Sequence, residues 1–180
     1  MKLKEMPPSV YLSLKLLSTP AERLGRLAVA GRHSIVVSLT SIPSRLSVVP
    51  IAIRSILNQD EQPEQIILWL NQELRGRIPK RLARLTGERF TIRYSTLDAP
   101  HLKLVACLAE FPGKTIVTCY DDHIYSKSWL RRLAATHESH PRDIIAHECR
   151  TIAYDDAGEP VPYAEWNYDS RRRTATEPWP

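Results

Sequence analysis

Short apolar runs alternate with longer helical patterns along most of the chain. The apolar runs are rich in β-branched residues, which is typical of buried strands; they fall at residues 34–40, 65–70, 90–94 and 115–119, and a further one starts at 143–146. Between them, apolar side chains recur at roughly helical spacing, over residues 46–59, 79–85 and 101–111 and in a last segment around 129–133. In the segment 101–111, one face of the expected helix carries Leu102, Val105, Leu108 and Phe111.

The order of these elements predicts the fold class. Helix-length connections between continuous apolar strands imply a parallel sheet with helices on both faces. We therefore expect an α/β fold of the Rossmann-like, doubly wound kind, with a mostly parallel sheet sandwiched by helices. Residues 1–32 are weakly patterned and interrupted by prolines, so we treat them as an N-terminal arm ahead of one domain over residues 33–180.

The predicted sheet indicates where a ligand would bind. In open α/β sheets, ligands bind beyond the carboxyl ends of the strands. This rule selects one edge of the sheet, made of residues 40–45, 71–73, 95–98 and 120–123.

Composition narrows the class of protein. With 43% hydrophobic and 25% charged residues the chain matches a folded soluble protein, and no apolar run approaches the roughly 20 residues of a membrane span. Pro7, Pro8 and Lys15 interrupt the N-terminal apolar residues, so a signal peptide is not expected. The three cysteines form no CxxC pair, which favours reduced thiols and a cytoplasmic location.

Several function classes lack their motifs. The six glycines form neither a dinucleotide-binding fingerprint nor a P-loop, which disfavours dinucleotide oxidoreductases and P-loop NTPases. No Gly-x-Ser-x-Gly elbow occurs, and Cys107 falls within an apolar helical pattern as a core thiol would. The spacing of His123, His147 and Cys149 does not match a zinc site.

A basic stretch lies between the second and third strands. Its members are Arg75, Arg77, Lys80, Arg81, Arg84 and Arg89. Such a run is usually a solvated helix face, but it also suits anionic lipid headgroups or RNA phosphates. Because aromatic residues are not interleaved with it, we expect no nucleic-acid partner.

The strongest chemical signal is the acid pair, Asp121 and Asp122, at the exit of the strand 115–119. Adjacent carboxylates repel each other unless a positive charge offsets them. Mg²⁺ or Mn²⁺ would do so, taking one or two protein carboxylates and completing its shell with phosphate oxygens and water. The alternative is a helix N-cap before a helix that starts at Ile124. Because the sequence lacks a glycine-rich phosphate-binding loop, basic side chains such as Arg45 or Lys103 would also have to neutralise the phosphate charge.

A set of segments in a fixed order resembles a known family. These segments are Val37–Arg45, Ser55–Gln59, Pro63–Leu70, His101–Leu104, Pro112–Thr118, Asp121–Tyr125, Lys127–Leu130 and, more weakly, Tyr163–Trp166. Together they are similar to the opening of bacterial glycosyltransferases with the GT-A fold, closest to family-2-like enzymes of polysaccharide and lipopolysaccharide synthesis. The resemblance covers roughly residues 34–166.

The resemblance implies a site for a nucleotide-diphosphate-sugar donor and a divalent cation, Mn²⁺ or Mg²⁺. Asp122 would be the principal metal ligand, and Asp121 would face the metal or the ribose. The residues implied for the nucleotide and its phosphates are Thr40, Ser41, Arg45, Asn71 and Lys103.

The sequence departs from the family pattern in two ways. Tyr120 stands where the acidic motif often has a third aspartate. The glycine-rich segment and acceptor-binding half of family members are not found, so we expect a fragment, a reduced member or a chain that needs a partner. Glu148 and Asp155 are the late acids that we nominate as a base, without a motif to support them, and the catalytic residues stay unassigned.

Three hypotheses follow. The first is metal-assisted sugar transfer to a glycan or lipid-linked acceptor, in the cytoplasm, with peripheral contact at the inner face of a membrane left open. The second is a catalytically inactive or partner-dependent nucleotide-sugar-binding domain. The third, nucleotidyl transfer, would require a glycine-rich basic loop after the first strand, which the sequence lacks.

Overall fold

The computed structural model describes residues 6–24, 29–30 and 34–169. The chain divides into two compact units, and the boundary along the sequence falls between Arg131 and Arg132. The first unit includes the helix α1 (Met6–Ser18) and the short helix η2 (Ala21–Arg23), which belong to the predicted arm.

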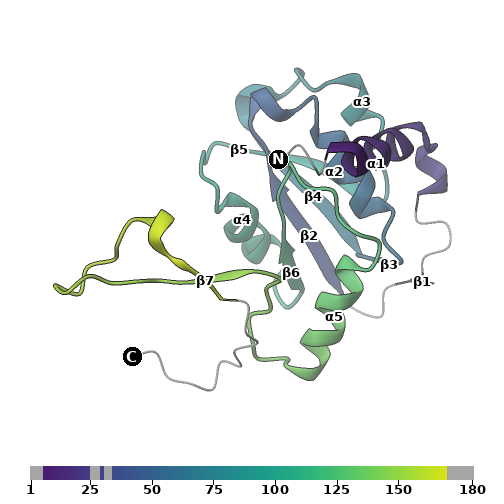
Figure 1. Ribbon diagram of the computed structural model, residues 1–180. Coiled ribbons are helices and arrows are strands. Elements are labelled where there is room, and N and C mark those ends of the chain that lie inside the picture. Colours follow the sequence, from purple (N-terminus) through teal and green to yellow (C-terminus); the bar gives the residue numbers. More distant parts are fainter. Residues whose placement is uncertain (1–5, 25–28, 31–33, 170–180) are drawn as a thin grey trace. The chain divides into compact units, whose positions relative to one another are not determined.

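Four strands of the first unit form one parallel sheet (Figure 1). They are β2 (Ile35–Thr40), β4 (Gln65–Asn71), β5 (Phe90–Ser95) and β6 (Thr115–Thr118), in the spatial order β5-β4-β2-β6. A separate parallel pair joins β1 (Val29–Ala30) to β3 (Glu61–Gln62). The predicted α/β fold with a parallel sheet is confirmed.

Two crossover helices lie on opposite faces of this sheet. The helix α2 (Val49–Leu57) connects β2 to β4 in one direction, and α4 (Leu102–Glu110) connects β5 back to β6 in the other. Because such crossovers are right-handed in nearly all proteins, the reversal of direction places the two helices on opposite faces. The predicted arrangement of helices on both faces therefore follows from the strand order.

The two central strands are buried on both faces. Successive side chains of a strand point to opposite faces. On the face covered by α4, the core cluster consists of Val36, Ile67, Trp69, Leu102 and Cys107. The opposite face of the sheet is also buried. Its side chains have no exposed surface and are those of Val37, Leu39, Ile66 and Leu68.

The buried face of α4 differs from the predicted one. Leu102 is buried as expected, but Val105 and Leu108 are exposed. The contact with the sheet uses Cys107, with the half-buried Ala106 beside it. The prediction was wrong for Val105 and Leu108, because the side of α4 that faces the sheet carries Leu102, Ala106 and Cys107, and Phe111 packs against the same cluster.

The N-terminal prolines begin a helix instead of breaking one. Pro7 and Pro8 lie in the first turn of α1, where a missing N–H costs no helical hydrogen bond. At the other end of α1, the Arg54 guanidinium of α2 donates to the carbonyls of Leu16 and Thr19, at 2.9 and 2.6 Å. These bonds attach α1 to the first unit.

The second unit contains most of α5 (Trp129–Ser139), which starts in the first unit, and an antiparallel pair of β7 (Cys149–Thr151) with β8 (Asn167–Asp169). The short helix η5 (Tyr163–Glu165) lies between these two strands. The strand predicted to start at residues 143–146 is wrong. The Asp143 N–H closes a turn on the His140 carbonyl, and the Ile144 side chain is 99% exposed.

A shorter basic helix, α3 (Lys80–Ala83), lies within the predicted segment 79–85. Among the described residues, no helix is both long enough and apolar enough to cross a lipid bilayer.

Candidate functional site

The acid pair lies where the order of the strands reverses. From β2, the chain first adds β4 and β5 on one side and then returns to add β6 on the other. The carboxyl ends of β2 and β6 are adjacent, because Ser38 pairs with Thr118 and the Cys119 N–H donates to the Ser38 carbonyl at 3.0 Å. Such a switch point is the usual ligand position in open α/β sheets.

Asp121 is held by two residues from the loop after β2. The Ser41 hydroxyl donates to Asp121 Oδ2 at 2.5 Å, and Arg45 Nη1 donates to Asp121 Oδ1 at 3.0 Å. Arg45 belongs to the short helix η3 (Pro43–Arg45), which turns the chain just beyond β2. The structure thus brings together three of the predicted site residues.

Asp122 is the accessible member of the pair. Its side chain is 43% exposed, against 5% for Asp121. Arg45 Nη1 lies 3.2 Å from Asp122 Oδ2, and His123 Nδ1 lies 2.8 Å from Asp122 Oδ1. Burial acts to raise the pKa of Asp122, but the His123 hydrogen bond and the charges of His123 and Arg45 together lower that pKa below its usual value.

A protein cation therefore offsets the repulsion between the two carboxylates. Arg45 bridges them, which explains how adjacent aspartates are accommodated at this edge. The alternative of a helix N-cap is wrong, because α5 begins at Trp129 and not at Ile124.

Lys103 reaches the segment that leads from β6 to the acid pair. Its ammonium donates to the Cys119 carbonyl at 3.1 Å and lies 4.0 Å from the centre of the Tyr120 ring. The backbone of Lys103 is fixed in turn, because the buried Ser38 hydroxyl donates to its carbonyl at 2.5 Å. Burial lowers the pKa of Lys103, against the opposing attraction of Cys119, Asp121 and Asp122.

Tyr120 contributes an aromatic face where the family motif often has a carboxylate. Its ring is exposed and lies against the Lys103 ammonium and, at 5.6 Å between ring centres, against His123. Beneath it, burial raises the pKa of the Cys119 thiol to about 12. This thiol is therefore protonated at neutral pH and is not a nucleophile.

The loop that carries the acid pair is closed by Tyr125. Its hydroxyl accepts from the Tyr120 N–H at 2.8 Å and donates to the Tyr120 carbonyl at 3.0 Å. The Tyr125 N–H donates to the Ser55 hydroxyl of α2 at 3.0 Å. Ser55 and Tyr125 support the site although the sequence did not predict it, because no local pattern signals a hydrogen bond between distant segments.

Two other residues predicted to face the nucleotide lie on the same edge of the sheet. Thr40 ends β2 and pairs with Trp69, and Asn71 ends β4 two residues later. The Asn71 side chain accepts the Glu73 N–H at 2.9 Å and so caps the short helix η4 (Gln72–Leu74). The sheet places Thr40 and Asn71 at this edge, and their role toward a nucleotide stays a prediction.

A divalent cation would bind at this edge through Asp122, the more exposed of the two carboxylates. Both oxygens of the buried Asp121 accept hydrogen bonds, and those of Asp122 lie against Arg45 and His123, so a cation would take the place of one of the Asp122 contacts. Among the residues that the structure describes, no group of three or more His, Cys, Asp or Glu side chains forms a closed metal site. Mg²⁺ and Mn²⁺ commonly use one protein carboxylate together with phosphate oxygens and water, so this arrangement suits a cation that arrives with its substrate.

Cavities are found along β5 as well. The larger measures about 520 Å³ and is lined by residues that include Trp69, Arg75, Arg93, Tyr94 and Glu110. A second one, of about 380 Å³, lies between α3 and β5. Neither of these two cavities is lined by a residue of the acid pair.

No protein-family model matches the sequence, and no curated protein matches it. The chain is similar to the crystal structure of 4-diphosphocytidyl-2C-methyl-D-erythritol synthase from Anaerococcus prevotii, with a TM-score of 0.47 and 11% sequence identity. The match covers 79% of this chain and 66% of that one, which is less than two thirds of its length. A likeness this loose carries no activity from that enzyme to this chain.

Proposed function

We propose that this chain binds a nucleotide-diphosphate-sugar at the switch point and transfers the sugar to a glycan or lipid-linked acceptor. The observation that supports this proposal is the cluster of Ser41, Arg45, Asp121 and Asp122 at the adjacent ends of β2 and β6. Lys103 adds a second cation within the same edge. Opposite charges in this arrangement suit a diphosphate that carries a divalent cation.

Each residue has a distinct part in the proposal. Asp122 would hold Mn²⁺ or Mg²⁺ through its exposed carboxylate, and the cation would stabilise the charge on the departing diphosphate. Asp121 keeps Ser41 and Arg45 in place and is a positioning residue. Arg45 and Lys103 would attract the diphosphate oxygens, because both are cations at this edge. Thr40 and Asn71 would face the nucleotide.

The second candidate is donor binding without turnover. It is favoured by the absence of an assigned base, because no motif supports the two nominated acids, Glu148 and Asp155. Asp155 Oδ1 accepts the N–H groups of Ala157 and Glu159, both at 2.9 Å, and so closes a turn. An acceptor hydroxyl needs a general base in most such transfers.

Calorimetric titration with a panel of nucleotide sugars, with and without Mn²⁺, tests the proposal, and donor hydrolysis is measured in parallel. We expect metal-dependent binding to the wild type and its loss in Asp122→Asn. The matched control, Asp156→Asn, changes an exposed aspartate of the second unit and should bind as the wild type does. Binding without hydrolysis or transfer selects the second candidate. Failure of every donor to bind contradicts both.

A further inference from the structure

The outward side of α1 is apolar. Tyr11 and Leu14 are 64% and 63% exposed, and Val10, Leu12 and Leu17 are exposed beside them. The least exposed side chains of the helix lie at a helical spacing on the other side and are Ser9, Ser13 and Leu16. The less exposed side of this helix therefore carries only two serines and one leucine, whereas five large apolar side chains of the helix are exposed. A contiguous exposed apolar surface marks a site of interaction.

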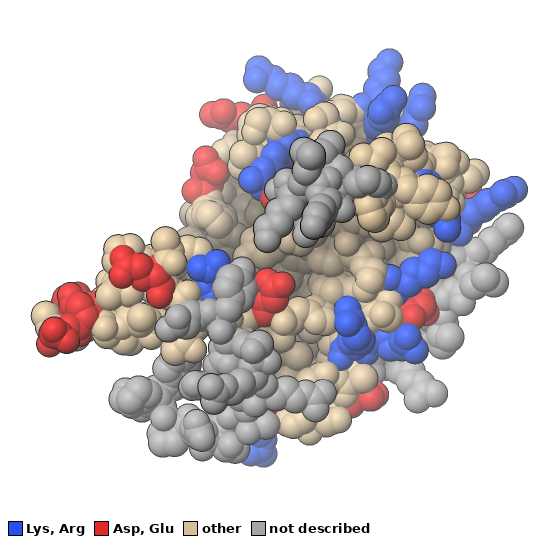
Figure 2. Space-filling view, viewed as in Figure 1, with Lys and Arg blue, Asp and Glu red and all other residues tan. Residues whose placement is uncertain are grey.

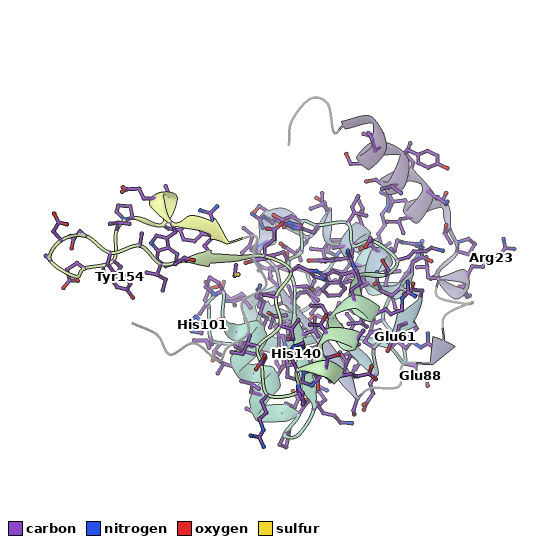
Figure 3. The ribbon with its side chains drawn as sticks, turned by 60° about the horizontal axis from the view of Figure 1, so that its bottom comes forward. Arg23, Glu61, Glu88, His101, His140 and Tyr154 are labelled. Atoms are coloured by element: carbon purple, nitrogen blue, oxygen red, sulfur yellow. The ribbon has the colours of Figure 1, made fainter. Side chains whose placement is uncertain are left out.

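Basic side chains surround this surface. Lys15 on α1 and Arg23 in η2 are exposed, and Figure 3 shows Arg23 extending outward from the end of this segment. α3 contributes the exposed Lys80 and Arg81, and both α1 and α3 contact α2. Figure 2 shows Lys and Arg side chains along the margin of the molecule where Figure 1 places α1 and α3. In the described segment 6–24, Glu22 is the single acidic residue.

We propose that the outward face of α1, with its basic surroundings, docks on the surface of an anionic lipid bilayer. Apolar side chains of a surface helix enter the boundary between headgroups and acyl chains, and nearby Lys and Arg side chains are attracted to anionic headgroups. Two copies of a face with Lys15, Arg23, Lys80 and Arg81 around it would repel each other, whereas anionic headgroups attract it. The charge around the apolar face therefore favours lipid over self-association.

Vesicle co-sedimentation tests this inference with the full chain and needs no sugar donor. It stands independently of the proposed transfer reaction. The probes are vesicles of phosphatidylcholine alone and of an equimolar mixture with phosphatidylglycerol. We expect binding to the mixed vesicles, little binding to neutral ones, and a decrease as salt is added.

Two variants locate the surface. Tyr11→Ser combined with Leu14→Ser should lower the partition coefficient at least about tenfold, because two apolar side chains no longer enter the bilayer. The control, Leu104→Ser with Leu108→Ser, removes two exposed leucines from α4 and should bind as the wild type does. Lys80→Glu with Arg81→Glu should weaken binding to anionic vesicles without changing α1.

Three outcomes overturn the inference. They are no binding of the wild type to mixed vesicles, equal loss in the α1 and α4 variants, and a wild-type dimer that the α1 variant converts to a monomer. The third outcome would assign this face to a second copy of the chain. Circular dichroism of each variant confirms that the fold is retained, as expected for exposed positions.

Discussion

The side-chain amide of Gln59 donates to the Ser126 carbonyl at 2.7 Å, across 67 positions of sequence. Gln59 is almost fully buried, and its other polar atom accepts the Leu130 N–H at 3.0 Å. The same amide also donates to the Ser55 carbonyl at 3.0 Å. One residue at the end of α2 thus fixes the chain that follows the acid pair.

Gln59→Leu should destabilise the protein by about 2–4 kcal/mol, because buried carbonyl and amide groups lose their partner. Urea denaturation measures the change. Gln72→Leu changes an exposed glutamine and should stay within about 0.5 kcal/mol of the wild type. A similar small effect at Gln59 would mean that its hydrogen bonds do not hold this loop.

Asp122 should make stability depend on pH in the metal-free protein. Its pKa is lowered on folding, so its contribution is present above the ordinary aspartate pKa, about 4, and is lost as the pH falls through the lower folded value. His123→Ala removes the hydrogen bond and the charge, and should raise the pKa of Asp122. NMR titration of the carboxyl carbon measures this pKa directly. No upward shift in the variant would contradict the assigned cause.

Lys103→Met should lower the affinity for the donor without lowering the stability of the fold. Since burial lowers the pKa of Lys103, its charge is costly in the folded protein, and the free energy of unfolding should stay equal or rise. Donor affinity should fall at least about tenfold, as expected for loss of a charge-assisted contact. Calorimetry and urea denaturation give the two quantities.

Lys114→Met is the matched control for that experiment. Lys114 pairs with Glu64 at 2.8 Å, at the amino ends of β6 and β4, whereas the acid pair follows the carboxyl end of β6. Its loss should leave donor affinity unchanged. An equal loss of affinity in both variants would show that net charge, and not the position of Lys103, governs binding.

The thiols should differ in reactivity. Cys107 and Cys119 are buried and Cys149 is exposed, and burial raises the pKa of Cys119 to about 12. At about pH 8, iodoacetamide should therefore modify Cys149 first, and all three only after denaturation. Peptide mass spectrometry identifies the modified residue. Early modification of Cys119 would show that the loop after β6 opens in the native protein.

The sequence predicted the sheet well because its strands are buried on both faces. Continuous β-branched runs such as Ile35–Leu39 and Ile66–Leu70 have few alternatives to a central parallel strand. The edge that carries Asp121 and Asp122 followed from the same pattern. Residues 143–146 failed because two isoleucines resemble a strand start, yet the segment forms a turn after α5.

The contacts within the site were less predictable. The sequence predicted that Arg45 would contact phosphate, but its bridge between both aspartates depends on how η3 directs the side chain. The roles of Ser55, Gln59 and Tyr125 depend on approach of segments that are distant in sequence. Hydrophobic spacing determines which side of an element is buried, but it does not determine which polar groups meet there.

Neighbouring residues of α2 hold two different parts of the molecule. The Arg54 guanidinium donates to two carbonyls at the end of α1, and the Ser55 hydroxyl accepts an N–H of the loop that carries the acid pair. If α1 docks on a bilayer as proposed, the helix that holds α1 also supports, through its next residue, the loop of the acid pair. The proposed docking surface and that loop would then be joined through a single turn of α2.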